Sequence, residues 1–439
     1  MNISIIVFIV LIVVAIVLFA KNVRRIIRNI KLGKDLDRKD RKKERLSLMA
    51  RVAIGQSKMN TRPIVSILHF VVYAGFIIIN IEVLEIVLDG LFGTHRLFAP
   101  LGSFYTVLIS TFEVLALLVL VSCVIFLIRR NIIRIKRFLS PEMGGWPKTD
   151  ANLILITEVL LMSAFILMNA VDAQLQLLGA EHYTKVGSFP ISGLLAGLFA
   201  TVSEGSLVVI ERGLWWFHIA GIFTFLNYLP YSKHFHILLA FPNVFYSKLT
   251  PAGQLPNMAA VKKEVELMFD PNVDPYAAPP EPVGEPERFG AKDVQDLSWK
   301  QLMDSYTCTE CGRCTDACPA NITGKALSPR KILMDTRDRL EEVGKGIDKN
   351  GKDYDDGKSL LRDYISEEEL LACTSCNACT DACPVNIDPL AIIIDLRQYL
   401  IMEESKAPAE WTGIFTNIEN NGAPWQFAQA DRLKWKDEE

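Results

Sequence analysis

The feature that most constrains the fold of this chain is a cysteine motif that occurs twice in its C-terminal half. Residues 307–322 read TCTECGRCTDACPANI and residues 372–387 read ACTSCNACTDACPVNI. Both copies follow C-x2-C-x2-C-x3-C-P, the ligand pattern of paired 4Fe–4S clusters. Three thiolates on one tight loop reach three irons of a cube, so the fourth iron must be ligated from elsewhere. The repeat therefore predicts two loops that share two clusters.

In such pairs the fourth cysteine of each motif ligates the cluster of the other motif. We expect the first cluster to be held by Cys308, Cys311, Cys314 and Cys383. We expect the second to be held by Cys373, Cys376, Cys379 and Cys318. A zinc ribbon needs only two pairs of ligands, so four cysteines in each motif are more than zinc requires. Thiolate ligands persist in a reducing compartment, which predicts that this half of the chain is cytoplasmic.

Apolar residues are concentrated in the first 240 of the 439 positions, and runs of about 20 such residues are long enough to cross a bilayer. We expect five spans, at about residues 3–20, 64–88, 104–128, 152–171 and 214–240. A weaker stretch, Ile191–Ile210, contains Ser203, Glu204 and Ser206, and we interpret it as an outer-face helix or re-entrant segment. The ninth cysteine, Cys123, lies in an apolar run and is expected to be a small buried hydrophobe.

Basic residues predict the orientation of these spans. Residues 21–62 contain fifteen Lys and Arg against four Asp and Glu, and residues 129–137 read RRNIIRIKR. Both segments are expected in the cytoplasm, which places the N-terminus outside and residues 1–20 as an uncleaved signal anchor. A nucleic-acid-binding arm is the alternative for residues 21–62. A loop beside anionic lipid is favoured, and we expect no nucleic acid partner.

Histidines in the spans are candidate haem ligands, because ionisable side chains inside a membrane are costly and usually functional. His218 and His236 are 18 residues apart, which is five turns if one helix continues past Pro230, or about 27 Å. His69 lies about two turns into the second span, at the depth of His236. We expect His69 and His236 to form an axial pair for b-type haem near the cytoplasmic face.

The other histidines carry weaker expectations. A partner for His218 would lie about ten positions after His69, but Ile79 occupies that place, so the ligand of a second, outer haem would have to come from an outer loop, where His95 and His182 lie. His234 is two residues short of the register of His236 and is expected to point elsewhere. Hydrogen bonding to backbone or water at the interface is the structural alternative for all of these histidines.

The remainder of the chain divides by composition. We expect a transmembrane domain at residues 1–245, a proline-rich linker at 246–295, a dicluster domain at 296–403 and a tail at 404–439. Apolar spacing predicts helices in SPRKILMDTRDRLEEVG, after Ser366, and in PLAIIIDLRQYLIMEE. The fold class is therefore all-α, with a five-helix transmembrane haem b-type bundle followed by an α-helical 2×(4Fe–4S) ferredoxin domain.

These stretches resemble known families. The segments around both cysteine motifs look like the dicluster module of the heterodisulfide reductase D and glycerol-3-phosphate dehydrogenase C family. SILHFVVYAGF and WWFHIAGIFTFLNYLPYSKHFHI are similar to the nitrate reductase gamma-subunit, or heterodisulfide reductase E, membrane fold. Gamma-type subunits carry two histidines on the second span, whereas only His69 is found here. The resemblance implies a membrane-bound iron–sulfur oxidoreductase subunit that passes electrons between a soluble donor, such as electron-transferring flavoprotein, and menaquinone.

Longer proteins of this kind continue into cysteine-rich CCG repeats, and this chain has no cysteine after Cys383. We therefore expect a separate CCG-domain iron–sulfur subunit to dock on the tail, with the complex in the bacterial inner membrane. No motif in the sequence indicates a catalytic nucleophile, a phosphate-binding loop or a flavin fingerprint, so the chain is expected to transfer electrons and not to be a complete enzyme. The alternatives are a membrane-anchored iron–sulfur redox sensor or assembly factor without haem, and a passive anchor for a partner enzyme.

Overall fold

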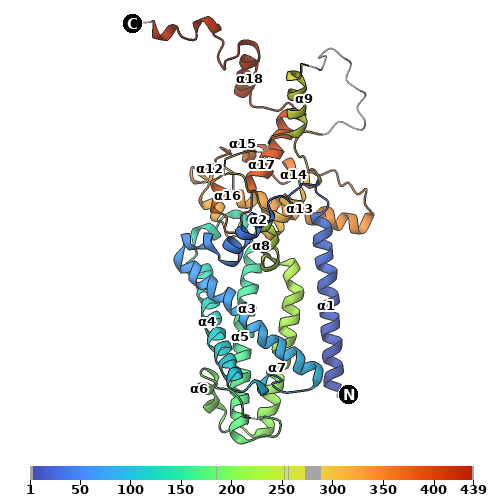
Figure 1. The fold of residues 1–439 in the computed structure, drawn as a ribbon, viewed down its shortest axis with the longest axis vertical. Coiled ribbons are helices and arrows are strands. Elements are labelled where there is room, and N and C mark those ends of the chain that lie inside the picture. Colours follow the sequence, from blue (N-terminus) through green and yellow to red (C-terminus); the bar gives the residue numbers. More distant parts are fainter. Residues whose placement is uncertain (1–2, 184, 252, 256, 272–287, 438–439) are drawn as a thin grey trace.

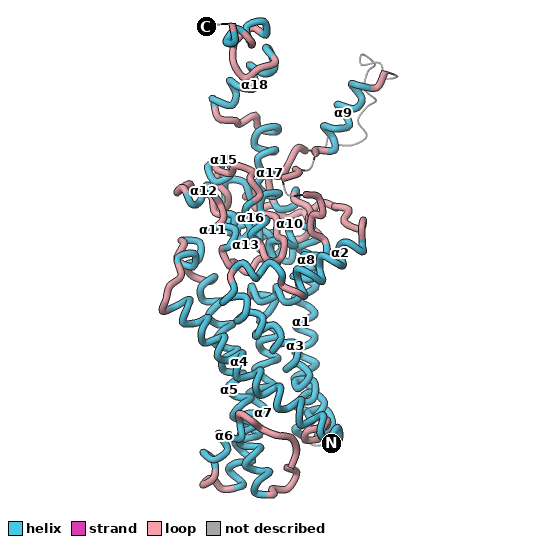
Figure 2. Tube along the Cα trace, turned by 60° about the vertical axis from the view of Figure 1, so that its left-hand side comes forward, coloured by secondary structure: helices cyan, strands magenta, loops and turns pink. Residues whose placement is uncertain are grey.

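The computed structural model describes residues 3–183, 185–251, 253–255, 257–271 and 288–437, and throughout these residues the regular structure is helical. Figures 1 and 2 show a long bundle with its N-terminus at one end and the cysteine-rich half packed on the other. We call these the distal end and the cluster end of the bundle. The all-α architecture predicted from the sequence is confirmed.

Within the described residues, five helices are long and apolar enough to cross a membrane. They are α1 (Ile3–Ile30), α3 (Pro63–Phe92), α4 (Ser103–Asn131), α5 (Trp146–Leu178) and α7 (Glu204–Tyr228). A helix pairs all of its backbone N–H and C=O groups internally, which lipid requires because it offers them no partner. Glycines at positive φ end two of these helices, Gly93 after α3 and Gly179 after α5.

The five helices form a closed ring. α1 contacts α3 and α7, α3 contacts α4, and α5 contacts both α4 and α7. The most apolar part of α5 is 56% buried, against 11% for α1, so α5 is the innermost helix and α1 the most peripheral. Their shared core includes Phe8, Ile109, Phe165, Ile219 and Cys123. Cys123 is 1% exposed.

The fifth span differs from the expected residues 214–240. Its helix begins earlier, at Glu204, and α7 ends at Tyr228, just before Pro230. Two short turns follow, and His236 begins a separate helix, α8 (His236–Phe245). The expectation that His218 and His236 share one continuous helix was therefore wrong, because the chain breaks at Pro230 instead of running through it. The stretch at 191–210 divides into α6 (Ser192–Ala196), a short turn and the first residues of α7.

The cluster half is built from short helices around one longer one. The longer helix, α13 (Pro329–Asn350), starts at the N-cap Ser328, and α15 (Glu367–Leu371) starts with a capping box at Ser366. The others are α10 (Trp299–Thr307), α11 (Arg313–Asp316), α12 (Pro319–Ile322), α14 (Leu360–Asp363), α16 (Ala378–Ala382) and α17 (Pro389–Gln398). The helices expected between and after the motifs are thus present.

One hydrophobic core joins the two halves. Ile26 and Ile30 of α1 and Phe235 pack with residues of the cluster half such as Leu302 and Leu340. Around this core, Asn29 donates a hydrogen bond to the Tyr306 hydroxyl at 2.8 Å. The backbone after α1 also pairs with the start of α10, where a Cβ on Gly33 would lie 2.7 Å from Leu297 O. The cluster half is therefore docked firmly on the bundle.

Helix α2 (Lys42–Met49) lies between these halves and contacts α8. The expected linker, residues 246–295, includes α9 (Ala259–Phe269), and its proline-rich part at 272–287 lies outside the described residues. Its last residues differ from an extended linker, since Ala291 and Val294 are fully buried in the shared core. The tail forms α18 (Ala409–Asn421), which projects from the cluster half together with α9 (Figure 1).

Candidate redox centre

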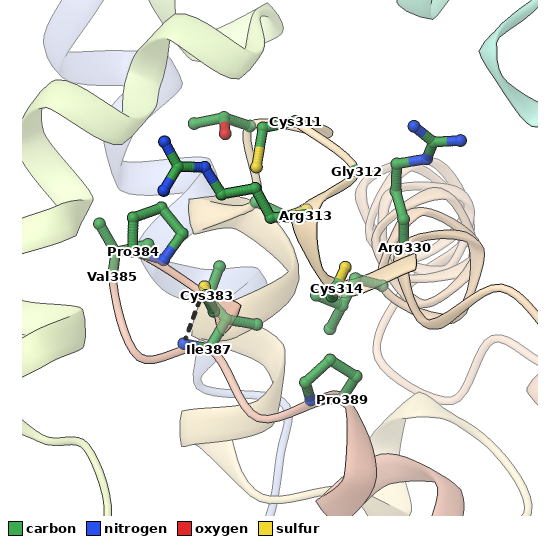
Figure 3. A pocket seen from close by; sticks show the side chains of 13 residues that line it. Cys311, Gly312, Arg313, Cys314, Arg330, Cys383, Pro384, Val385, Ile387 and Pro389 are labelled. Atoms are coloured by element: carbon green, nitrogen blue, oxygen red, sulfur yellow. Dashed lines mark hydrogen bonds between the residues drawn. The ribbon is translucent and has the colours of Figure 1, made fainter. Parts of the chain in front are cut away.

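The first predicted ligand set lies around one pocket. Three cysteines of the first motif, Cys308, Cys311 and Cys314, line it together with Cys383 of the second motif. Cys308 follows the C-terminus of α10, Cys314 lies on α11, and Cys383 follows α16. Figure 3 shows the side chains of Cys311, Cys314 and Cys383 on different sides of this space. The two motifs are therefore brought together as the shared-ligand pattern predicts.

The backbone turns in the same way in both motifs. Two residues after the first cysteine, Glu310 and Ser375 have φ of 56°, and their N–H groups donate to the sulfurs of Cys308 and Cys373 at 3.4 Å. Four residues after the first cysteine, φ is again positive. Such turns direct N–H groups into a concavity that suits an anionic cluster.

The position four residues on is occupied by Gly312 in the first motif, with φ of 74°, and by Asn377 in the second. A Cβ at Gly312 would lie 2.6 Å from the Arg330 guanidinium. Glycine is therefore needed here both for its backbone conformation and for the close approach of the arginine.

The second predicted set also contains a cysteine of the other motif. Burial raises the pKa of Cys373, and the thiolates of Cys318 and Cys376 raise it further, so these three side chains are neighbours. Burial also raises the pKa of Cys379 to about 12, with a contribution from Cys373. Cys318 thus lies beside cysteines of the second motif, although it belongs to the first.

The chemistry of the donor sets fits a metal cluster. Burial raises the pKa of Cys314 well above its ordinary value, and the thiolates of Cys308, Cys311, Cys383 and Cys379 raise it further. Thiolates crowded in this way are stabilised when iron supplies positive charge. No three His, Cys, Asp or Glu side chains in the described ranges are grouped as ligands of a single ion. Thiolates of both sets act electrostatically on Cys314, so the two sites adjoin one another.

The membrane half reaches the first site through the segment before α3. Arg313, a buried side chain that lines the pocket, donates to Lys58 O and to Thr61 Oγ1, both at 3.3 Å. Lys58 Nζ in turn donates to Cys383 O at 3.3 Å. The polypeptide that leads directly into the second span thus contacts the rim of the candidate cluster site.

Three histidines gather at the same end of the bundle. His69 lies on α3, and the rings of His234 and His236 are 5.6 Å apart. Burial lowers the pKa of His234 to about 3, with further contributions from His236 and His69. The expected pair, His69 and His236, is therefore brought together. The expectation that His234 points elsewhere was wrong, because the turns after α7 replace the helical register on which it rested.

The hydrogen bonds of these rings fit haem ligation. His69 Nδ1 lies 3.1 Å from Gln56 Oε1, and His236 Nδ1 lies 3.0 Å from Lys233 O. Each contact fixes the proton on Nδ1, and Nε2 makes no hydrogen bond within the described part of the chain. Metal-binding histidines are oriented in this manner, with one nitrogen held by an oxygen and the other free to ligate.

His218 is held in the same way but has no second imidazole. Its Nδ1 lies 3.1 Å from Leu161 O, and the side chain is 1% exposed beside Phe165. Among the residues the structure describes, no other histidine interacts with it. The bundle therefore brings two of the three predicted haem histidines together and leaves His218 alone.

Sequence reasoning missed three residues of this centre. Gln56 and the carbonyl of Lys233 orient the histidine rings, and nothing in the pattern marks either position. Arg313 was detectable, because the two motifs differ at this position, where the second has Ala378. Comparing the motifs position by position would have marked the arginine as one of five differences between them.

Comparisons with known proteins agree with the cysteine geometry. Residues 307–387 match the family model of the 4Fe–4S dicluster domain, so this segment is such a domain. The chain is 30% identical to "Probable iron-sulfur-binding oxidoreductase FadF" of Bacillus subtilis, over 98% of this chain and 60% of that protein. It is 25% identical to "EtfAB:quinone oxidoreductase" of Syntrophomonas wolfei, over 92% of this chain and 55% of that protein.

A shorter match covers about a third of the chain. The "Probable membrane-anchored ferredoxin" of Chromohalobacter salexigens is 29% identical over 34% of this chain and 24% of its own length. No solved structure matches the chain. This chain thus spans 60% and 55% of the lengths of the two relatives that match nearly all of it. Its relatives are iron–sulfur oxidoreductases and membrane ferredoxins, which supports a role in electron transfer.

Proposed function

We propose that this chain is the membrane electron-transfer subunit of a quinone-linked oxidoreductase. Two 4Fe–4S clusters would be held by the two cysteine sets, and a b-type haem by His69 and His236. Electrons would pass between a soluble partner and a quinone, with menaquinone the expected form. A haem exchanges one electron at a time, which suits it to link iron–sulfur clusters with quinone chemistry beside the bilayer.

The observation that carries this proposal is the position of Arg313 between the two candidate sites. Its side chain lines the Cys308/Cys311/Cys314/Cys383 pocket, and its charge also acts on His69. The histidine and cysteine groups are therefore neighbours at the junction of the bundle and the dicluster domain. Redox groups that exchange electrons rapidly must lie close together. A dicluster domain that was only attached to the membrane by the helices would not need its cysteines beside the histidines.

The same junction supports the proposed location in a bacterial inner membrane. The basic segments 21–62 and 129–137 both lie at the cluster end, where Arg62 contacts Asp316 at 2.8 Å and Arg28 contacts Asp348 at 2.9 Å. Basic loops mark the cytoplasmic face of membrane proteins. The dicluster domain would accordingly lie in the cytoplasm and the N-terminus outside.

We propose a soluble partner that binds the tail. The exposed side chains Ile414, Phe415 and Ile418 lie on α18, and Trp425 and Trp435 follow them. Exposed apolar side chains in this density are typical of a protein interface. We propose a CCG-domain iron–sulfur unit as this partner. Electron-transferring flavoprotein is the expected donor, in line with the name of the Syntrophomonas wolfei relative.

The test is optical and magnetic spectroscopy of the full chain purified from membranes. The wild type should show a reduced-minus-oxidised haem b band and the paramagnetic signals of reduced 4Fe–4S clusters. His69→Ala and His236→Ala should lose the haem band and retain the cluster signals. His182→Ala is the matched control, since this histidine lies exposed in the distal loop, and should retain both.

Three other results would contradict the proposal. A wild-type protein with clusters but no haem band would favour the membrane-anchored redox sensor or assembly factor. Clusters that a quinol cannot reduce in native membranes would favour a passive anchor for the partner enzyme. A haem band that survives both histidine substitutions would show that other residues ligate the haem.

A further inference from the structure

The distal end of the bundle holds a buried polar network that none of the candidate redox sites uses. At its centre is Arg96, which follows α3 and is 8% exposed. Its guanidinium donates to Asp172 Oδ2 from Nε at 2.8 Å and from Nη2 at 2.6 Å, and to Asn169 Oδ1 at 2.9 Å. Its third partner is the Tyr105 hydroxyl, at 3.3 Å. The arginine is thus fully engaged and already matched by one carboxylate.

Three further carboxylates in this region are held by donors. Asp89 accepts from the backbone N–H of Arg96 at 2.8 Å, and Glu85 accepts from that of Phe98 at 2.7 Å. Glu113 of α4 accepts from the backbone N–H of Ile191 at 3.0 Å. These acids tie the distal loops to the helices, so a structural role accounts for them.

Glu82 on α3 is the exception. It is 2% exposed, Oε1 lies 3.9 Å from Arg96 Nη1, and Oε2 has no hydrogen-bond partner among the described residues. The groups that act on it are Glu85 on its own helix, Glu113 on α4, Asp172 on α5, and Arg96. Three acids therefore act on the Glu82 carboxyl, and its nearest cation, Arg96, is already paired with Asp172. An ionised carboxylate in such a place costs several kcal/mol, so the site favours a bound proton.

A row of ionisable groups connects Glu82 with the distal surface. Arg96 lies between Glu82 and Asp172, and Asp172 Oδ2 lies 3.7 Å from His95 Nε2. The His95 side chain is 19% exposed, and its buried Nδ1 has no partner within the described residues. The loop after α3 therefore brings a titratable ring to the surface directly above the buried carboxyls. Histidine is well suited to exchange a proton there.

We propose that Glu82 is a proton-exchange site inside the membrane, linked to the distal surface through Asp172 and His95. The O–H bond of Glu82 breaks, a water molecule beside Arg96 carries the proton to the Asp172 carboxylate, the His95 ring takes it from there, and distal water accepts it. Arg96 stays charged and stabilises whichever carboxyl is ionised, and no electron is transferred. The proposal rests on this network alone and requires neither the haem nor the quinone of the proposed function.

The test is infrared spectroscopy of the full chain in lipid nanodiscs, recorded as pH-induced difference spectra and after transfer to D2O. The wild type should show the C=O band of a protonated carboxylic acid, with a deuterium shift that marks its exchange. Glu82→Gln should remove this band, and Glu82→Asp should restore a carboxylic acid band at a shifted frequency. Glu181→Gln, which changes an exposed distal carboxyl, is the control and should leave the band unchanged.

The route has its own test in the rate of exchange. His95→Ala should keep the Glu82 band and slow its exchange with D2O by roughly a hundredfold, the loss typical when a positioned proton carrier is removed. A band unchanged in Glu82→Gln would overturn the assignment of the site. An exchange rate unchanged in His95→Ala would overturn the route. Both readouts are independent of haem content, so failure of the proposed function would be seen separately.

Discussion

At the scale of single residues, charge distinguishes the two candidate cluster sites. Arg313 and Arg330 line the pocket of the first cysteine set, and Lys58 donates to the carbonyl of Cys383. Within the described residues, the second set has only Arg397, whose side chain donates to the backbone of Cys373, and each set also has an acid nearby, Glu310 at Cys308 and Asp388 at Cys379. Positive charge and hydrogen bonds stabilise the reduced form of a cluster. The first site should therefore have the higher reduction potential.

Arg313→Gln should lower the reduction potential of the first cluster, because the substitution removes a positive charge beside it. We expect a decrease of roughly 50–100 mV, from one charge a few ångströms away in a partly buried site. A redox titration followed by electron paramagnetic resonance measures this. Ala378→Gln, at the equivalent position of the second motif, is the control and should leave the first potential unchanged. Equal shifts in both variants would contradict the assignment of charge to one site.

Crossed ligation gives a second residue-scale prediction. Cys383 lines the pocket of the first motif, so Cys383→Ser should affect the first cluster although the residue belongs to the second motif. Cys318→Ser should affect the second cluster for the same reason. Each variant should lose the signal of one cluster, as judged by iron content and paramagnetic resonance. Loss of the cluster of the variant's own motif in both cases would contradict the crossed arrangement.

At this scale the sequence predicts the candidate metal ligands better than it predicts the residues that surround and orient them. The cysteine sets follow from spacing, because sulfur and iron geometry leaves few alternatives. His69 follows from its depth in an apolar run. His234 was misjudged and Gln56 was not found, because their positions depend on turns that a helical register does not describe.

At the scale of elements, a buried ion pair within α10 and the hydrogen bonds of Asn243 fix the cluster half against α8. Lys300 of α10 donates to Asp304 at 2.7 Å and to Asn243 of α8 at 3.0 Å. Asn243 is fully buried and donates to Val385 O at 3.0 Å, close to the second motif. This pair therefore positions α8, which begins with His236, against the dicluster domain.

Lys300→Met should destabilise the chain by about 3–5 kcal/mol, because it leaves the Asp304 carboxylate buried without its cation. The double variant Lys300→Met/Asp304→Leu should recover most of this loss, since neither charge remains. Denaturant or thermal unfolding of the purified protein measures both. A double variant as unstable as the single one would show that packing, and not the unpaired charge, causes the effect.

Helix α17 gives a pH-dependent prediction. Burial raises the pKa of Asp395 to about 6, although Gln301 donates to its carboxylate at 2.6 Å. A carboxyl with a raised pKa stabilises the fold while protonated, so this contribution is present below about pH 4 and is lost as pH rises through 6. The free energy of unfolding of Asp395→Asn, relative to that of the wild type, should therefore rise by about 1–2 kcal/mol between pH 4 and pH 7. Unfolding measured at each pH checks this, with the exposed Asp353→Asn as a control that should show no such gain.

The elements themselves were largely predictable. Four spans and the helices α13, α15 and α17 lie where periodicity and caps place them, since apolar length and N-cap chemistry act locally. The fifth span was displaced because Glu204 and Ser206 lower the hydropathy of its start, while apolar residues continue beyond Pro230 into a separate helix. Local hydropathy cannot tell a membrane helix from an apolar helix buried at the junction.

At the scale of the whole molecule, the two halves share one hydrophobic core, although the sequence composition predicts two separate domains. Ala291 and Val294 were expected in a linker but pack beside Leu302 and Leu340. The basic segments that predict the cytoplasmic face are also the segments that dock the dicluster domain. The predicted orientation in the membrane and the docking of the dicluster domain therefore depend on the same basic residues. A test of the orientation is thus also a test of which side of the membrane the dicluster domain occupies.

The predicted orientation can be tested with a membrane-impermeant thiol reagent on intact cells. Glu181→Cys lies in the exposed distal loop, and Lys352→Cys lies in the exposed turn after α13. The positive-inside rule places the first outside and the second inside, so only Glu181→Cys should be labelled before lysis. The wild type is the control, because Cys123 is buried and the other cysteines lie in the dicluster domain. Labelling of Lys352→Cys in intact cells would place the clusters outside, where thiolate ligands would be exposed to oxidation.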